Sequence, residues 1–173
     1  MINLIHGDCL EEMKNIPDQS IDMVLSDIPY GTTACKWDVV IPFEPMWKEL
    51  KRIIKPRGAI CLFGSEPFSS ALRMSNIKQF KYDLFWNKRK PGNPLIAKYR
   101  PLRIIENISV FCKGKHNYFP QMIEREEIKK TGICKTRIKN FSTKFEITNR
   151  SYTHKYPTDI LDFSNASQKD RYH

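Results

Sequence analysis

The segment VLSDIPYGTTACKWD (Val24–Asp38) runs an apolar stretch directly into an acid, a proline, an aromatic residue and a glycine. Proline and glycine after an apolar run are ordinary turn residues. In an open α/β sheet, ligands bind where the strands end at their carboxyl termini. A strand over Ile21–Ser26 would place Asp27–Tyr30 at such an end. The segment therefore predicts a turn that also serves as a binding site.

The residue types in this turn suit one kind of ligand. A carboxylate at Asp27 offers only acceptors, the main-chain carbonyl of Ile28 offers another, and Tyr30 offers a flat ring. Two acceptors beside an aromatic ring fit an exocyclic amino group on a planar heterocycle, as in adenine or cytosine. The alternative is that Asp27 caps a turn and Tyr30 packs on the core. Pro29 stiffens the turn under both interpretations.

The rest of the first half alternates strand and helix patterns. Short apolar runs alternate with segments whose apolar residues recur at helical spacing. This alternation favours a mostly parallel α/β sheet. We predict strands at Ile2–Ile5, Ile21–Ser26, Ala59–Phe63, Phe80–Trp86 and Glu106–Cys112, and helices capped by Asp8, over Phe43–Ile54 and capped by Ser65.

Positive charge is concentrated in the second half. The 173 residues have a formal net charge of +10. Residues 1–75 hold 8 Lys and Arg against 10 Asp and Glu, whereas residues 76–173 hold 21 against 9. Such asymmetry favours a polyanionic partner, namely nucleic acid, over a merely solvated basic surface.

Other features exclude several classes of protein. The five cysteines form no C-x-x-C pair and the four histidines show no metal-ligand spacing, so we expect reduced thiols and no metal site. No run of about 18 apolar residues and no signal peptide is present. We therefore expect a cytoplasmic protein without a membrane segment.

The turn and its neighbours resemble one family. SDIPYG resembles motif IV, D-P-P-Y, of the amino-methyltransferases that modify adenine N6 or cytosine N4 in DNA. The preceding INLIHGDCLEEMKNIPDQSIDMVL resembles the N-terminal segment of β-class members. Three later segments resemble phage-type and restriction-modification members, so the resemblance covers residues 2–122. They are FEPMWKELKRIIKPRGAICLFGSEPF, KYDLFWNK and ENISVFCKGKHNYFPQM.

The resemblance implies a fold, an activity and a set of catalytic residues. It implies an incomplete Rossmann-like methyltransferase sheet with a basic recognition appendage. The activity would be methyl transfer from S-adenosyl-L-methionine to adenine N6 of a base flipped out of double-stranded DNA. Asp27, Ile28, Pro29 and Tyr30 would be catalytic, and Asp8 would contact the cofactor. Ile28 replaces the first proline of the motif, but any residue supplies its carbonyl; Asp27, where serine is common in cytosine-N4 members, favours adenine N6.

The same resemblance divides the chain. Residues 1–112 would form the catalytic region and residues 113–173 a target-recognition region, partly irregular, in which EREEIKK is a candidate short helix. A basic loop over residues 87–103 would contact phosphates. Its expected phosphate-binding residues are Lys88, Arg89, Lys90, Lys98, Arg100 and Arg103.

One family element is not found in the sequence. β-class members continue past the recognition region into a segment like HPTQKP and an F-x-G-x-G loop at the cofactor site, whereas this sequence ends in SQKDRYH and contains no G-x-G. We therefore expect this chain alone to bind the cofactor weakly and turn over poorly. It could be a truncated gene product, a shortened chain, or one half of a split enzyme completed by a second chain. Two alternative functions stay open: a non-enzymatic nucleic-acid-binding protein, and a methyltransferase acting on cytosine N4 or on RNA.

Overall fold

The computed structural model describes residues 2–92, 94–131 and 150–164. The described residues up to Asn117, together with those from Asp159 onward, form one compact unit, and Tyr118–Thr158 form a second. The functional boundary predicted after residue 112 stays a prediction.

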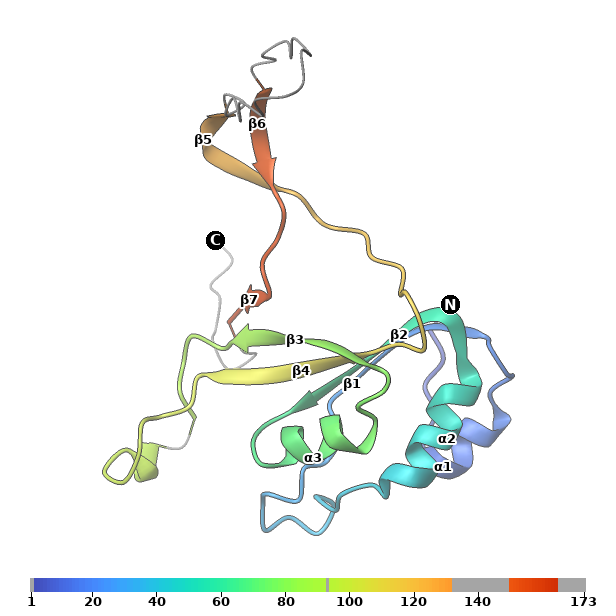
Figure 1. The fold of residues 1–173 in the computed structure, drawn as a ribbon. Coiled ribbons are helices and arrows are strands. Elements are labelled where there is room, and N and C mark those ends of the chain that lie inside the picture. Colours follow the sequence, from blue (N-terminus) through green and yellow to red (C-terminus); the bar gives the residue numbers. More distant parts are fainter. Residues whose placement is uncertain (1, 93, 132–149, 165–173) are drawn as a thin grey trace, which may run out of the picture. The chain divides into compact units, whose positions relative to one another are not determined.

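The first unit is built on a five-stranded sheet (Figure 1). β1 pairs parallel with β2 and β3 pairs parallel with β7, whereas β4 runs antiparallel to both β2 and β3. The sheet is therefore mixed, and the prediction of a mostly parallel sheet is wrong. The reason is that β3 and β4 are consecutive strands joined without a crossover α-helix, and such neighbours pair antiparallel. In sheet order the strands are β1 (Ile21–Ser26), β2 (Ile54–Gly64), β4 (Ile105–Phe111), β3 (Phe80–Asn87) and β7 (Ile160–Asp162).

The helices of this unit are short. The predicted cap at Asp8 is confirmed, because its Oδ1 accepts a hydrogen bond of 2.8 Å from the backbone N–H of Leu10. None of the helices in the described part of the chain has the length and apolarity needed to cross a bilayer. The helical elements are α1 (Cys9–Glu12), η1 (Met13–Asn15), α2 (Phe43–Ile53), α3 (Phe68–Ser75) and η2 (Pro94–Ile96).

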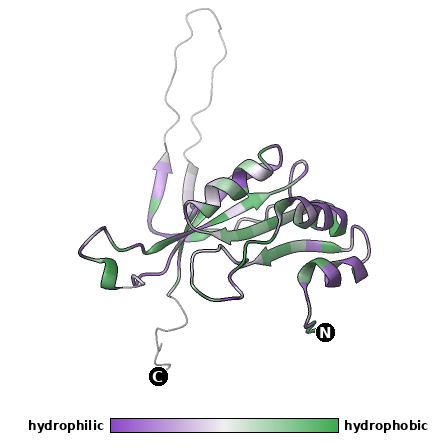
Figure 2. Ribbon diagram, turned by 90° about the horizontal axis from the view of Figure 1, so that it is seen from below, coloured by the Kyte–Doolittle hydropathy of each residue, from purple (hydrophilic) through white to green (hydrophobic). Residues whose placement is uncertain are grey.

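The main core lies between α2, α3 and one face of the sheet. In Figure 1 both helices lie on the same side of the strands. Phe111 of β4 is fully buried, with its ring centroid 4.8 Å from that of Trp47 and 5.8 Å from that of Phe80. Figure 2 shows hydrophobic residues along most of the strands, whereas the helices carry both kinds. A second cluster on the opposite face centres on Cys61, Ile108 and Val110.

Three local predictions are wrong. Residues 2–6 form no strand, and Ile2 and Leu4 are 89% and 91% exposed, because no described strand pairs with them. The candidate helix EREEIKK lies instead in strand β5 (Ile123–Thr131), which pairs antiparallel with β6 (Arg150–Lys155) in the second unit. Cross-strand pairing here overrides the local helical pattern. α3 is capped by Pro67 rather than Ser65, which contributes only its carbonyl to the N–H of Ser69.

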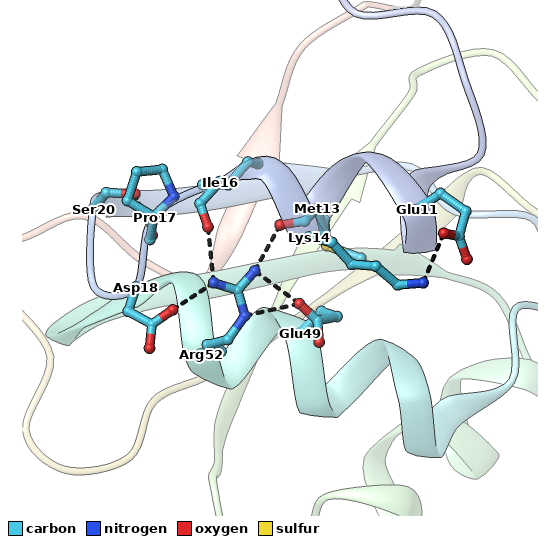
Figure 3. Close-up of polar contacts among 9 residues, drawn as sticks. All are labelled: Glu11, Met13, Lys14, Ile16, Pro17, Asp18, Ser20, Glu49 and Arg52. Atoms are coloured by element: carbon cyan, nitrogen blue, oxygen red, sulfur yellow. Dashed lines mark hydrogen bonds and ion pairs between the residues drawn. The ribbon is translucent and has the colours of Figure 1, made fainter.

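Arg52 of α2 joins the N-terminal segment to the core (Figure 3). Its guanidinium donates to the main-chain carbonyls of Ile16 at 2.8 Å and Met13 at 2.7 Å. It also pairs with the carboxylates of Asp18 and Glu49. One cation therefore binds four acceptors, two of them on the main chain of the segment that leads into β1.

We expect Arg52→Met to lower the melting temperature by several degrees. The substitution keeps much of the aliphatic stem but leaves the two carbonyls and two carboxylates without their shared donor. Thermal unfolding followed by circular dichroism measures the change. Lys48→Met, which removes an exposed cation from the same helix, is the control and should shift the melting temperature much less. Equal shifts in the two variants would contradict the role given to Arg52.

Candidate active site

The carboxyl ends of β1 and β2 bring two turns together. The two strands are parallel neighbours, with Ser26 opposite Leu62. Asp27–Tyr30 therefore leave β1 at the same edge of the sheet at which Gly64–Phe68 leave β2 and enter α3. This is the position predicted for a binding site.

Tyr30 links these two turns. Its ring stacks on Phe68, with centroids 5.2 Å apart and planes inclined by 29°. Its hydroxyl donates a hydrogen bond to Oδ1 of Asp27. Burial, and then the hydrogen bond to the Asp27 carboxylate, raise the pKa of Tyr30 well above its usual value, so the hydroxyl stays protonated as a donor. Two of the predicted catalytic side chains are thus in direct contact.

The geometry combines the two interpretations of the turn. One side of the Tyr30 ring packs on Phe68, a core residue, as the structural interpretation requires. Tyr30 is nevertheless only half-buried, and the side chain of Asp27 is exposed. Among the described residues, no donor other than Tyr30 binds the Asp27 carboxylate, and none binds the Ile28 carbonyl. Both acceptors can therefore receive hydrogen bonds from a ligand.

Asp38 organises the turn that follows Tyr30. Its Oδ1 accepts the backbone N–H groups of Tyr30 and Gly31, both at 2.9 Å, and its Oδ2 accepts those of Thr32 at 2.9 Å and Thr33 at 2.7 Å. The Asp38 residue is only 8% exposed. Sequence reasoning missed both Asp38 and Phe68. The sequence feature that pointed to Asp38 was an acidic residue a few positions after a turn, where backbone N–H groups need an acceptor outside helices and strands.

Because of its hydrogen bonds, the contribution of the Asp38 carboxylate to the stability of the fold depends on pH. A hydrogen bond from the Thr33 side chain, and then the N–H groups of Gly31, Thr33 and Thr32, lower the pKa of Asp38 from 3.8 to about 2. Because the pKa of Asp38 is lower in the folded than in the unfolded state, the ionised group stabilises the fold above about pH 4, and this stabilisation is lost as the pH falls toward 2.

We expect the melting temperature of Asp38→Asn to lie below that of wild type by the largest amount at about pH 6, and this difference to shrink between about pH 4 and pH 2. A difference independent of pH over this range would contradict the assignment.

Comparisons with known proteins show the family of the chain. A family model described as DNA methylase (N6_N4_Mtase) matches residues 21–173. The chain belongs to this family. The matched segment contains the whole five-stranded sheet and both turns at its edge.

Two curated relatives are longer than this chain. The type II methyltransferase M.HinfI of Haemophilus influenzae is 31% identical over an alignment of 116 residues that covers 51% of this chain and 32% of the relative. The DNA adenine methyltransferase YhdJ of Escherichia coli K12 is 30% identical over an alignment of 128 residues that covers 66% of this chain and 42% of the relative. The chain thus spans less than half the length of these two curated relatives.

A solved structure shares the fold. The PvuII DNA methyltransferase (cytosine-N4-specific) superposes with a TM-score of 0.57 at 17% sequence identity, covering 96% of this chain and 58% of that one. At this identity the likeness establishes the architecture. It confirms the predicted Rossmann-like methyltransferase fold.

The predicted cofactor contact lies at the start of α1. Asp8 is exposed, and one of its carboxylate oxygens caps the helix. The cofactor role of Asp8 stays a prediction. The described residues contain no group of three or more His, Cys, Asp or Glu side chains placed to hold a metal ion.

The cations of the predicted basic loop differ in their environment. Lys88 pairs with Glu106 at 2.5 Å, and Arg89 pairs with Asp162 at 3.0 Å. These two residues are therefore engaged by carboxylates of the same unit. The other predicted phosphate-binding residues are exposed, and their role stays a prediction: Lys90, Lys98, Arg100 and Arg103.

Proposed function

We propose that this chain carries the base-binding and catalytic half of a DNA amino-methyltransferase that uses S-adenosyl-L-methionine and acts on adenine N6. The observation that supports this most is the exposed Asp27 carboxylate held beside the half-buried Tyr30 ring at the carboxyl end of β1. The family match supports the reaction class. An acid at position 27, together with similarity to a protein named as a DNA adenine methyltransferase, supports adenine as the base.

Asp27 and Ile28 would bind and activate the target amine. The lone pair of an exocyclic amine is delocalised into the base, so the nitrogen is a poor nucleophile. Donating its two N–H groups to the Asp27 carboxylate and the Ile28 carbonyl would draw the nitrogen toward tetrahedral geometry. These hydrogen bonds strengthen as positive charge develops on nitrogen, so they stabilise the transition state more than the ground state. Tyr30 keeps the carboxylate oriented through its own hydrogen bond.

The target base must leave the duplex to reach these groups. Extruding a base costs a few kcal/mol, and stacking on an aromatic side chain returns about 1–3 kcal/mol. Phe68 supports one side of the Tyr30 ring, so the base would stack on the other. The Tyr30 ring would thus lie between the buried Phe68 ring and the flipped base.

Asp8 would be the contact with the cofactor. The Asp8 carboxylate caps α1 through Oδ1 and is otherwise exposed, so it retains acceptor capacity for hydroxyl or amino groups. When bound, S-adenosyl-L-methionine supplies an electrophilic methyl group. The contribution of this chain is to orient the amine that receives it.

The test is transfer of labelled methyl from S-adenosyl-L-methionine to unmethylated duplex DNA, followed by nucleoside analysis. Label in N6-methyladenine is the expected result. Label in N4-methylcytosine would overturn the choice of base but not the reaction class. DNA binding without label, and without cofactor binding by calorimetry, would show that this chain alone is a nucleic-acid-binding protein and not an enzyme.

The basic loop should control the salt dependence of DNA binding. We expect the triple substitution of Lys90, Lys98 and Arg100 by glutamine to weaken binding and to reduce the slope of log K against log salt by about two to three, since each phosphate contact contributes about 0.9. Fluorescence anisotropy at several salt concentrations measures the slope. The control is glutamine at Lys14, Lys48 and Lys78, three exposed cations of the first half of the unit that give the same change in net charge. An equal effect in the control would show that net charge, not the loop, determines affinity.

A further inference from the structure

Asp38 occupies a backbone anion site of its own chain. Four successive N–H groups, from Tyr30 to Thr33, converge on its two carboxylate oxygens at 2.7–2.9 Å. Concave backbone nests of this kind bind anions, and hydrogen bonds to an ionised acceptor are stronger than neutral ones. The Asp38 residue is nearly buried, so solvent does not compete for it. We name Asp38 together with Tyr30–Thr33 the Asp38 turn.

The Asp38 turn needs a special backbone conformation at Gly31. Gly31 has φ +67°, in the left-handed region that favours glycine, and a Cβ there would lie 3.0 Å from Cγ2 of Val40. The turn is therefore specified twice, by a carboxylate that binds its N–H groups and by a glycine that permits its shape.

The first N–H group in the Asp38 turn belongs to Tyr30. Tyr30 is consequently held at three points: its ring by Phe68, its hydroxyl by Asp27, and its backbone by Asp38. Among the hydrogen bonds of the described residues, none joins Asp38 to Asp27, so the hydrogen bonds of Asp38 reach the base-binding groups through the turn. Asp38 binds the backbone directly at Tyr30 and at the three residues that follow it.

We propose that Asp38 is a positioning residue that sets the orientation of the Tyr30 ring for stacking with the flipped base. This inference rests on the proposed function. It assigns to Asp38 a role in capturing the base, separate from any role in holding the fold or in binding phosphates. Asp38→Asn keeps the size of the side chain but replaces one acceptor oxygen by an NH2 group that opposes two N–H donors, so half of the turn loses its partner.

The probe is free deoxyadenosine, titrated into the whole chain and followed by NMR, with thymidine as a nucleoside that lacks the exocyclic amine. We expect the dissociation constant for deoxyadenosine to rise about tenfold in Asp38→Asn, as loss of a base–aromatic stack would give. The affinity for duplex DNA, which depends on phosphate contacts, should change less than twofold. All measurements are made at a temperature at which each variant is folded, so that lost stability alone does not move the result.

Two further variants separate the possible causes. Asp22→Asn makes the same chemical change at an exposed residue of β1 that pairs with Lys55, and it should bind deoxyadenosine as wild type does. Gly31→Ala strains the Asp38 turn without touching its charge, and it should weaken deoxyadenosine binding in the same direction as Asp38→Asn. If Asp38→Asn does not fold, Gly31→Ala decides the question.

The outcomes distinguish this inference from the proposed function. Deoxyadenosine binding by wild type that is lost in Asp27→Ala but unchanged in Asp38→Asn and Gly31→Ala would overturn the positioning role and leave the proposed function intact. Wild type that binds deoxyadenosine no better than thymidine would overturn the proposed function, and this inference with it. Weakened binding in both turn variants, with normal affinity for duplex DNA, would establish it.

Discussion

Asp27→Asn is expected to reduce methyl transfer to DNA by about 10²- to 10³-fold, the range found when one hydrogen bond that stabilises developing charge is removed. The asparagine side chain has nearly the same shape but lacks the negative charge that stabilises the positive charge developing on the amine. It can also turn its own NH2 group toward the amine, where two donors repel. Labelled methyl incorporation into unmethylated duplex DNA measures the rate, and titration with deoxyadenosine measures base binding.

Asp22→Asn is the matched control for this substitution. Asp22 lies on β1, the strand that leads into the turn, and it is exposed. Its partner Lys55 is also a surface residue. An exposed ion pair of this kind contributes little to stability. The control should retain the wild-type rate and melting temperature. Equal rates in wild type and Asp27→Asn would remove Asp27 from the catalytic machinery.

Phe111→Ala is expected to lower the free energy of unfolding by about 3–5 kcal/mol. Phe111 is fully buried at the end of the central strand β4, and its ring contacts Trp47 of α2 and Phe80 of β3. Alanine at this position would leave a cavity between helix and sheet that rigid strands cannot close. Urea denaturation gives the change as a shifted midpoint at constant slope.

Phe119→Ala makes the same change at a surface position. Phe119 is 79% exposed, so its removal should alter the free energy of unfolding of the chain by no more than about 0.5 kcal/mol. A loss below about 1 kcal/mol in Phe111→Ala would contradict the packing described for the core.

Several features of the fold and the site were predictable because their causes are local. The strand Ile21–Ser26 was predicted with the bounds observed for β1, and α2 was predicted to within one residue. The cap at Asp8 depends on a carboxylate two residues before the N–H that it binds. Periodicity, capping and turn residues are properties of neighbouring positions, so a single sequence contains them.

Other features depend on segments that are far apart in the chain. Strand pairing decides the antiparallel direction of β4 and the strand character of β5. It also decides that no strand of the described residues pairs with Ile2–Ile5. Strand pairing is decided by the packing of whole elements, so the sequence of one strand contains little information about its partner. The sequence alone could not predict it.

The site divides in the same way. By itself the sequence determined the chemistry of the turn, because Asp27, Ile28 and Tyr30 are adjacent and their functional groups can be assigned from residue type. Only the tertiary structure decided what holds that turn in place. Phe68 reaches Tyr30 from the next strand–helix connection, and Asp38 folds back onto four N–H groups from five to eight residues earlier. These contacts form only when β1 and β2 lie side by side and the loop after Tyr30 closes, since hydrogen bonding and stacking act over a few ångströms in space whatever the separation along the chain.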